Sequence, residues 1–131
     1  MARTQGEMEA EISEAIVKFE KEYMGRGPLE TKTYLIDDMV LVRLKGVMTP
    51  AELQLAASEN PRGRELIKQV RHELLEKGRP LLEAVLRAVT GRRVASLHTD
   101  ISTRTGERVI VFTLPSPGEP VPASRGGHDH S

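Results

Sequence analysis

Apolar positions that recur every three or four residues predict an amphipathic helix near the start of the chain. Most charged residues of this segment fall on the other sides of the helix. A glycine-rich stretch at 25–28 predicts the helix end, because glycine supplies a left-handed cap and the proline at its end cannot continue the helix. The apolar stripe consists of Met8, Ile12, Ala15, Ile16, Phe19 and Tyr23.

Two strands are predicted next, at Thr31–Ile36 and Met39–Lys45, around an Asp-Asp turn. Pairing Ile36 with Met39 places apolar residues on both faces of this hairpin. In a sheet with one face in solvent, apolar and polar residues usually alternate along each strand. One face carries Leu35, Val40, Val42 and Leu44, and the other carries Tyr34, Ile36, Met39 and Leu41. We predict that the second group is an interface, buried in a homodimer. The alternative is that helix 49–57 folds back over it.

Thr49, Pro50 and Glu52 predict the start of a short helix, since they supply a cap, a first-turn proline and a capping box. A longer helix is expected to open at Asn60 and to end near Gly91. Pro80 lies inside it, which leaves two alternatives: one kinked helix, or two helices end to end. The apolar stripe predicted to face the core comprises Ile67, Val70, Leu74, Leu81, Val85 and Val89.

Alternating residues predict a second hairpin, formed by Val94–Ser102 and Arg108–Leu114. Its expected core face carries Ala95, Leu97, Thr99, Ile101, Ile110, Phe112 and Leu114. The order of helices and hairpins predicts an α+β fold of two helix–β-hairpin halves, with an antiparallel four-stranded sheet and helices packed on one face. We expect a single domain over residues 1–115 and a disordered tail over 116–131, where Pro, Gly and Ser replace periodicity.

Composition removes several classes of function. The 131 residues carry 19 basic and 19 acidic side chains, so the basic excess of a nucleic-acid-binding protein is missing. With no cysteine, disulfides and thiol chemistry are excluded. No apolar run suggests a leader or a membrane span, so we expect a cytoplasmic protein without a cofactor.

The strongest candidate for chemistry is a polar row on the predicted strand 94–102, where His98 and Asp100 share a face. Asp100 could orient the imidazole as in a general base. Residues two apart on a strand are about 7 Å apart, however, too far for a direct triad contact. A polar surface ladder explains the row more simply. The candidate ligand-binding residues are His98, Asp100, Arg104 and Arg108, with no catalytic or metal-binding residue predicted.

Three segments resemble a known family: EMEAEISEAIVKFEKEYMGRG at 7–27, TKTYLIDDMVLVRLKGVMTPAEL at 31–53 and LHTDISTRTGERVIVFTL at 97–114. Together they are similar to the MpsC-like family of small bacterial proteins, over about residues 6–115. That family is named after a sodium-dependent system that generates membrane potential, and membrane subunits of related systems are linked to inorganic-carbon uptake. The resemblance implies a soluble accessory protein of such a system and supplies no catalytic residues.

Two functional hypotheses follow. The first is a non-catalytic accessory or regulatory module, a homodimer that serves a membrane system through a protein partner. The second is an enzyme or small-ligand-binding protein that uses the face of His98 and Asp100. A pocket on that face, with Arg104 or Arg108 converging on it, would favour the second hypothesis. A flat apolar patch on the first hairpin would favour the first.

Overall fold

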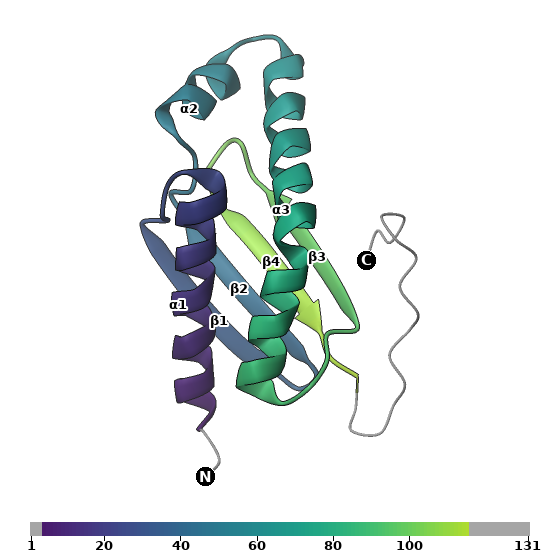
Figure 1. Cartoon of the computed structure of the whole chain (residues 1–131). Helices are drawn as coiled ribbons and strands as arrows, with labels where there is room; N and C mark the ends of the chain where they lie inside the picture. The colour runs from purple at the N-terminus through teal and green to yellow at the C-terminus, as the bar shows by residue number, and fades with distance from the viewer. Residues whose placement is uncertain (1–3, 116–131) are drawn as a thin grey trace.

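A computed structural model describes residues 4–115 of the chain (Figure 1). The helices and strands alternate in two similar halves. In chain order they are α1 (Gln5–Met24), β1 (Glu30–Ile36), β2 (Met39–Lys45), α2 (Pro50–Ala57), α3 (Pro61–Thr90), β3 (Ser96–Ile101) and β4 (Arg108–Thr113). The predicted tail at 116–131 lies outside the described residues.

The four strands form one antiparallel sheet in the order β1-β2-β4-β3. Each hairpin therefore stays intact, and the second hairpin joins the first through β4. The predicted α+β class is confirmed. The predicted register of the first hairpin is also confirmed, since Ile36 lies opposite Met39 across the turn. Asp37 adopts a φ of 54° there, a left-handed conformation that aspartate tolerates in tight turns.

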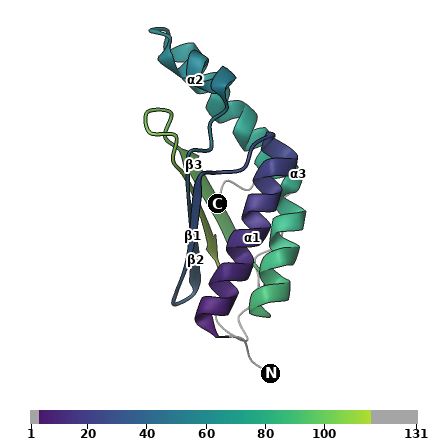
Figure 2. The same ribbon diagram turned by 90° about the vertical axis from the view of Figure 1, so that its left-hand side faces the viewer.

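Helices α1 and α3 lie side by side on one face of the sheet, and the opposite face is left open (Figure 2). Helix α2 lies beyond the end of the sheet and packs against α3. It has no buried residue. Helix α2 therefore does not fold back over the open face, and that alternative for covering the first hairpin is wrong.

Local sequence signals set the helix ends. Thr49 and Glu52 form the predicted capping box at the start of α2. An equivalent box that the sequence analysis did not identify joins Thr4 and Glu7 at the start of α1. Gly25 ends α1 with a φ of 80°, which explains the glycine at this position.

Helix α3 is continuous through Pro80, so the alternative of one helix is confirmed and the alternative of two helices end to end is wrong. The predicted core stripe of this helix is correct in part. Ile67 is buried and Val89 packs against the core, as predicted. Val70 and Leu81 are 52% and 46% exposed, so their assignment to the core is wrong. The buried positions of α3 are Gly63, Ile67, Arg71, Leu75, Gly78, Leu82 and Leu86.

The core lies between the helices α1 and α3 and the covered face of the sheet. Gly78 of α3 allows close packing there, because a Cβ at this position would lie 2.0 Å from the Phe19 ring of α1. The sheet contributes the alternating positions predicted from the sequence. Buried side chains on this face are Val40, Val42, Leu44, Leu97, Ile101, Ile110 and Phe112.

Candidate functional site: a buried ionic cluster beside a hollow

Three charged side chains lie in the core where the helices meet the sheet. Glu20 of α1, Arg71 of α3 and Arg108 of β4 are 0%, 2% and 1% exposed. Each occupies a position that the periodicity of its element assigns to the interior. Because an isolated buried charge is costly, their contacts with one another determine whether this arrangement is stable.

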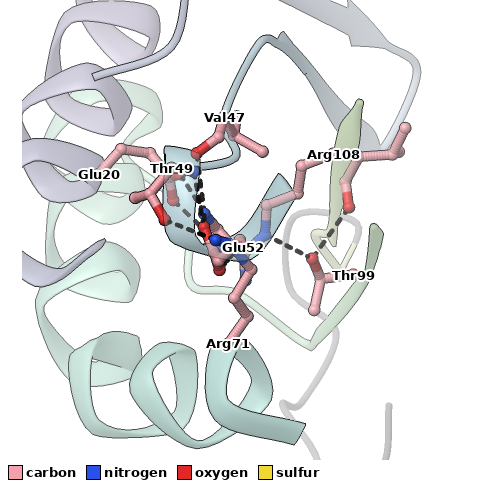
Figure 3. A network of polar contacts seen from close by, with 8 residues as sticks. Glu20, Val47, Thr49, Glu52, Arg71, Thr99 and Arg108 are labelled. Carbon is pink, nitrogen blue, oxygen red and sulfur yellow. Dashed lines mark hydrogen bonds and ion pairs between the residues drawn. The ribbon is translucent and has the colours of Figure 1, made fainter. Parts of the chain in front are cut away.

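Arg71 connects helix α3 to helix α2 and to the loop before it (Figure 3). Its Nε and Nη2 atoms donate to the two carboxylate oxygens of Glu52, at 2.8 and 2.6 Å. Nη2 also donates to the Val47 carbonyl at 2.8 Å. The two-pronged contact matches the planar guanidinium to the carboxylate and fixes the position of the Arg71 head group.

Arg108 connects the sheet to helix α1. Its Nη1 atom donates to Glu20 Oε2 at 3.1 Å, and its Nε atom donates to the Thr99 hydroxyl at 3.3 Å. The Thr99 hydroxyl in turn donates to the Val109 carbonyl. Glu20 Oε1 lies 3.6 Å from Arg71 Nη1, so the Glu20 carboxylate stands between both arginines.

Burial perturbs the acid–base behaviour of the cluster. Desolvation raises the pKa of Glu20 above its ordinary value of 4.5, against the opposing effects of Arg108 and Arg71. Burial also acts to raise the pKa of Glu52, but hydrogen bonds from Arg71 and Thr49 and the charge of Arg71 outweigh it, and the net change is downward. Glu20 is thus the carboxylate whose charge the fold tolerates less well. It is fully buried and contacts both arginines of the cluster.

Both arginines also line a hollow of about 220 Å³ between α3 and β3. Lys68 and His72 of α3 and Asp100 of β3 contribute to its walls. Lys68 Nζ lies 3.5 Å from Asp100 Oδ1, and both side chains are largely exposed. The hollow is therefore open to solvent at this ion pair and bounded by buried guanidinium groups inside.

The structure separates the residues that the sequence analysis grouped as a ligand site. His98 is exposed on β3 and contacts the Ser96 hydroxyl at 3.2 Å. Arg104 is exposed in the turn between β3 and β4. Arg108 lies in the core, and Asp100 reaches Lys68 at the sheet edge. Of the four candidates, Asp100 and Arg108 line the hollow, and His98 and Arg104 do not. The structure therefore brings two of the four candidate residues together.

The four candidate interface residues do lie together on the open face of the sheet. Tyr34 pairs with Leu41 and Ile36 with Met39 across the two strands. Tyr34 and Ile36 are 40% and 44% exposed. The apolar second face predicted for the first hairpin is therefore present in the folded chain.

The sequence analysis did not identify the ionic cluster, although each member leaves a local signal. Glu20 continues the four-residue steps of Ile12 and Ile16, and Arg71 lies four residues from both Ile67 and Leu75. Arg108 begins the alternation that Ile110 and Phe112 continue. A charged residue in phase with a buried apolar row marks an internal ion pair, but the phase does not name the partner.

The described chain holds no helix long and apolar enough to cross a bilayer. Within residues 4–115, no group of three or more histidine, aspartate or glutamate side chains is placed to hold a metal ion. These findings leave the open face and the hollow as the features from which function can be argued.

Comparison with known proteins places the chain. Residues 4–116 match the family model described as "Na+-translocating membrane potential-generating system (MpsC)". The chain is also similar to the "Uncharacterized protein YbcI" of Bacillus subtilis (strain 168), with 46% identity over 114 residues, which cover 87% of this chain and 90% of that protein. No solved structure matches the chain. The match to nearly the whole described fold shows that this protein belongs to the MpsC family.

Proposed function

We propose that the protein is a non-catalytic accessory or regulatory component of the Na⁺-translocating system after which its family is named, and that it works as a homodimer. The observation that carries this proposal is the uncovered apolar face of the first hairpin, in a chain that belongs to the MpsC family. Family membership supports the choice of cellular system. The open face supports assembly through this surface.

The apolar part of the open face is continuous across three strands. Tyr34 of β1 lies opposite Leu41 of β2, which lies opposite Val111 of β4. In the next row, Ile36 lies opposite Met39. Contiguous apolar surface of this kind is typical of protein interfaces, because burial removes it from water.

Charges at the two ends of this apolar block favour a second copy as its occupant. The turn end carries Asp37 and Asp38, and the other end carries Lys32 opposite Arg43. Arg43 pairs with Glu107, whereas Lys32 makes no ion pair with a described residue. If a twofold axis runs across the strands, the acidic turn of each copy lies over the basic row of the other.

The dimer can be tested by sedimentation or multi-angle light scattering at micromolar concentration. We expect the wild type to be a dimer and Leu41→Glu to be a monomer, because the substitution buries an unpaired charge in the contact. Leu81→Glu is the matched control, since it places the same charge on an exposed leucine of α3, away from the open face. Circular dichroism must show that both variants fold.

Two results would contradict this assembly. The first is a folded wild type that stays monomeric at the highest soluble concentration, which would show that no dimer forms. The second is a dimer that dissociates with Leu81→Glu but persists with Leu41→Glu, which would show that the contact lies on the exposed side of α3.

The cellular role needs a separate measurement. In cells of the source organism that lack the gene, we expect a smaller Na⁺-dependent membrane potential, read with a voltage-sensitive dye. Wild type should restore it, Leu81→Glu should also restore it, and Leu41→Glu should not. An unchanged Na⁺-dependent potential in the deletion strain would contradict the accessory role.

A further inference from the structure

The lining of the hollow between α3 and β3 has more cationic than anionic side chains, a feature that the proposed accessory role does not use. Its walls include the permanent cations Lys68, Arg71 and Arg108, but only one carboxylate, Asp100. The carboxylates of Glu20 and Glu52 contact the arginines and do not line the hollow. A ligand in the hollow therefore meets the cationic side of the ionic cluster.

The two arginines are held in place before any ligand arrives. Arg71 is fixed by Glu52 and the Val47 carbonyl, and Arg108 by Glu20 and Thr99. Arg71 Nη1 is buried and has no hydrogen-bond partner among the described residues, although Glu20 Oε1 lies 3.6 Å away. Fixed cationic groups lose little conformational entropy when an anion binds, which favours affinity.

The positive charges of Arg71 and Arg108 also repel each other. Burial lowers the pKa of Arg108 from its ordinary value, and the neighbouring charge of Arg71 adds to this effect, while Glu20 opposes it. Additional negative charge near both guanidinium groups would relieve this repulsion.

The rim of the hollow can adapt to an anion. Lys68 and Asp100 form a solvent-exposed pair, with side chains that are 51% and 80% exposed. Such pairs contribute little to stability, so the Lys68 ammonium can turn from Asp100 to a ligand at low cost. His72 lies in the same wall, one turn further along α3.

We propose that this hollow binds a small oxyanion of the carboxylate or phosphate class. Guanidinium groups match the paired oxygens of such anions, and the Lys68 ammonium adds a mobile charge at the entrance. The volume of about 220 Å³ suits a small anion, since pockets for drug-sized ligands start near 300 Å³. A metal cation fits poorly, because Asp100 is the single carboxylate in the walls.

The test is a titration of the full-length protein with sodium phosphate and, separately, sodium acetate, at constant ionic strength set with sodium chloride. Backbone amide NMR shifts report the site. We expect saturable shifts confined to the walls of the hollow with at least one of the two anions, and none with chloride. The anion that saturates at lower concentration identifies the preferred class.

Substitutions at the rim leave the buried cluster intact and give effects of opposite sign. Lys68→Gln should raise the Kd about tenfold or more, the scale of one lost charge-assisted contact. Asp100→Asn should lower the Kd, because it removes the competing carboxylate. Lys77→Gln, at an exposed position of α3 that does not line the hollow, should leave the Kd unchanged.

Three outcomes would overturn the proposal. These are an absence of saturable shifts with both anions, equal shifts with chloride, and a Kd that Lys68→Gln leaves unchanged. Because Lys68 and Asp100 lie outside the four candidate interface residues, these outcomes are independent of the dimer proposal.

Discussion

Helix α3 has two apolar stripes, one of which is buried and the other largely exposed. The inner stripe includes Ile67, Leu75 and Leu82, which are at most 2% exposed. The outer stripe includes Leu66 and Val70, which are 43% and 52% exposed, and Leu81 continues it. The inner stripe is interrupted by an arginine and two glycines, so an apolar pattern alone does not select it for the core.

The difference teaches that fit to neighbouring elements decides which stripe is buried. Gly63 lets α2 approach α3, since a Cβ there would lie 2.6 Å from the Leu55 carbonyl oxygen. Gly78 makes room for the Phe19 ring in the same way. Arg71 enters the core because Glu52 and Glu20 meet its charge. The interruptions in the inner stripe are therefore the positions at which α3 fits its neighbours.

The largest expected effect compares two adjacent leucines. Leu82→Ala should lower the free energy of unfolding by about 2–5 kcal/mol, because it opens a cavity in the core. Leu81→Ala, one residue earlier on the outer stripe, should cost under about 1 kcal/mol. Chemical denaturation of both variants measures the contrast. Equal losses would mean that the outer stripe is buried in solution, as it would be in a helix-mediated assembly.

A smaller effect is expected at Gly78. Gly78→Ala adds a methyl group against Phe19 and should destabilise the protein by about 1–3 kcal/mol despite the higher helix propensity of alanine. Gly6→Ala, in an exposed turn of α1 with no atom within 4 Å of the added Cβ, should instead stabilise by up to about 1 kcal/mol. Thermal melts followed by circular dichroism separate the two. A stabilising Gly78→Ala would contradict the close approach of α1 and α3.

The smallest expected effect is the pH dependence of stability that comes from Glu20, whose carboxylate lies beside Arg71 of the inner stripe. Folding raises the pKa of Glu20 above 4.5, so the folded state binds this proton more tightly than the unfolded state. Stability from Glu20 therefore falls as pH rises through the interval between 4.5 and the raised pKa. As the pH falls toward 4.5, the free energy of unfolding of wild type should rise relative to that of Glu20→Gln. Parallel urea denaturation curves at each pH check this, and a difference that stays constant with pH would contradict it.

The parts of the fold that the sequence predicted depend on local signals. The capping box at Thr49 and Glu52, the turn at Asp37 and the glycine after α1 each act within a few residues. The face assignments of both hairpins followed from a period of two. These signals do not require knowledge of a distant partner.

The phase of α3 and the ionic cluster could not be predicted in the same way. Glu20 and Arg108 are 88 residues apart in the sequence, and only the folded chain brings their side chains within hydrogen-bond distance. Arg71 is one of several arginines on α3, and its carboxylate partners come from the separate helices α1 and α2. The hollow is also lined by residues that are distant in the sequence, from α3, β3 and β4, so its lining is formed only in the folded chain.

The contact between Glu52 and Arg71 adds to the free energy that is needed to unfold α2 locally. A helix of eight residues without a buried side chain would ordinarily exchange its amide hydrogens through cheap, frequent opening. Here opening α2 withdraws Glu52 from Arg71 and leaves a guanidinium in the core with a more distant counter-charge. We therefore expect the protection of α2 against exchange to depend on the ionisation of Glu52, and to fall when acid protonates this carboxylate.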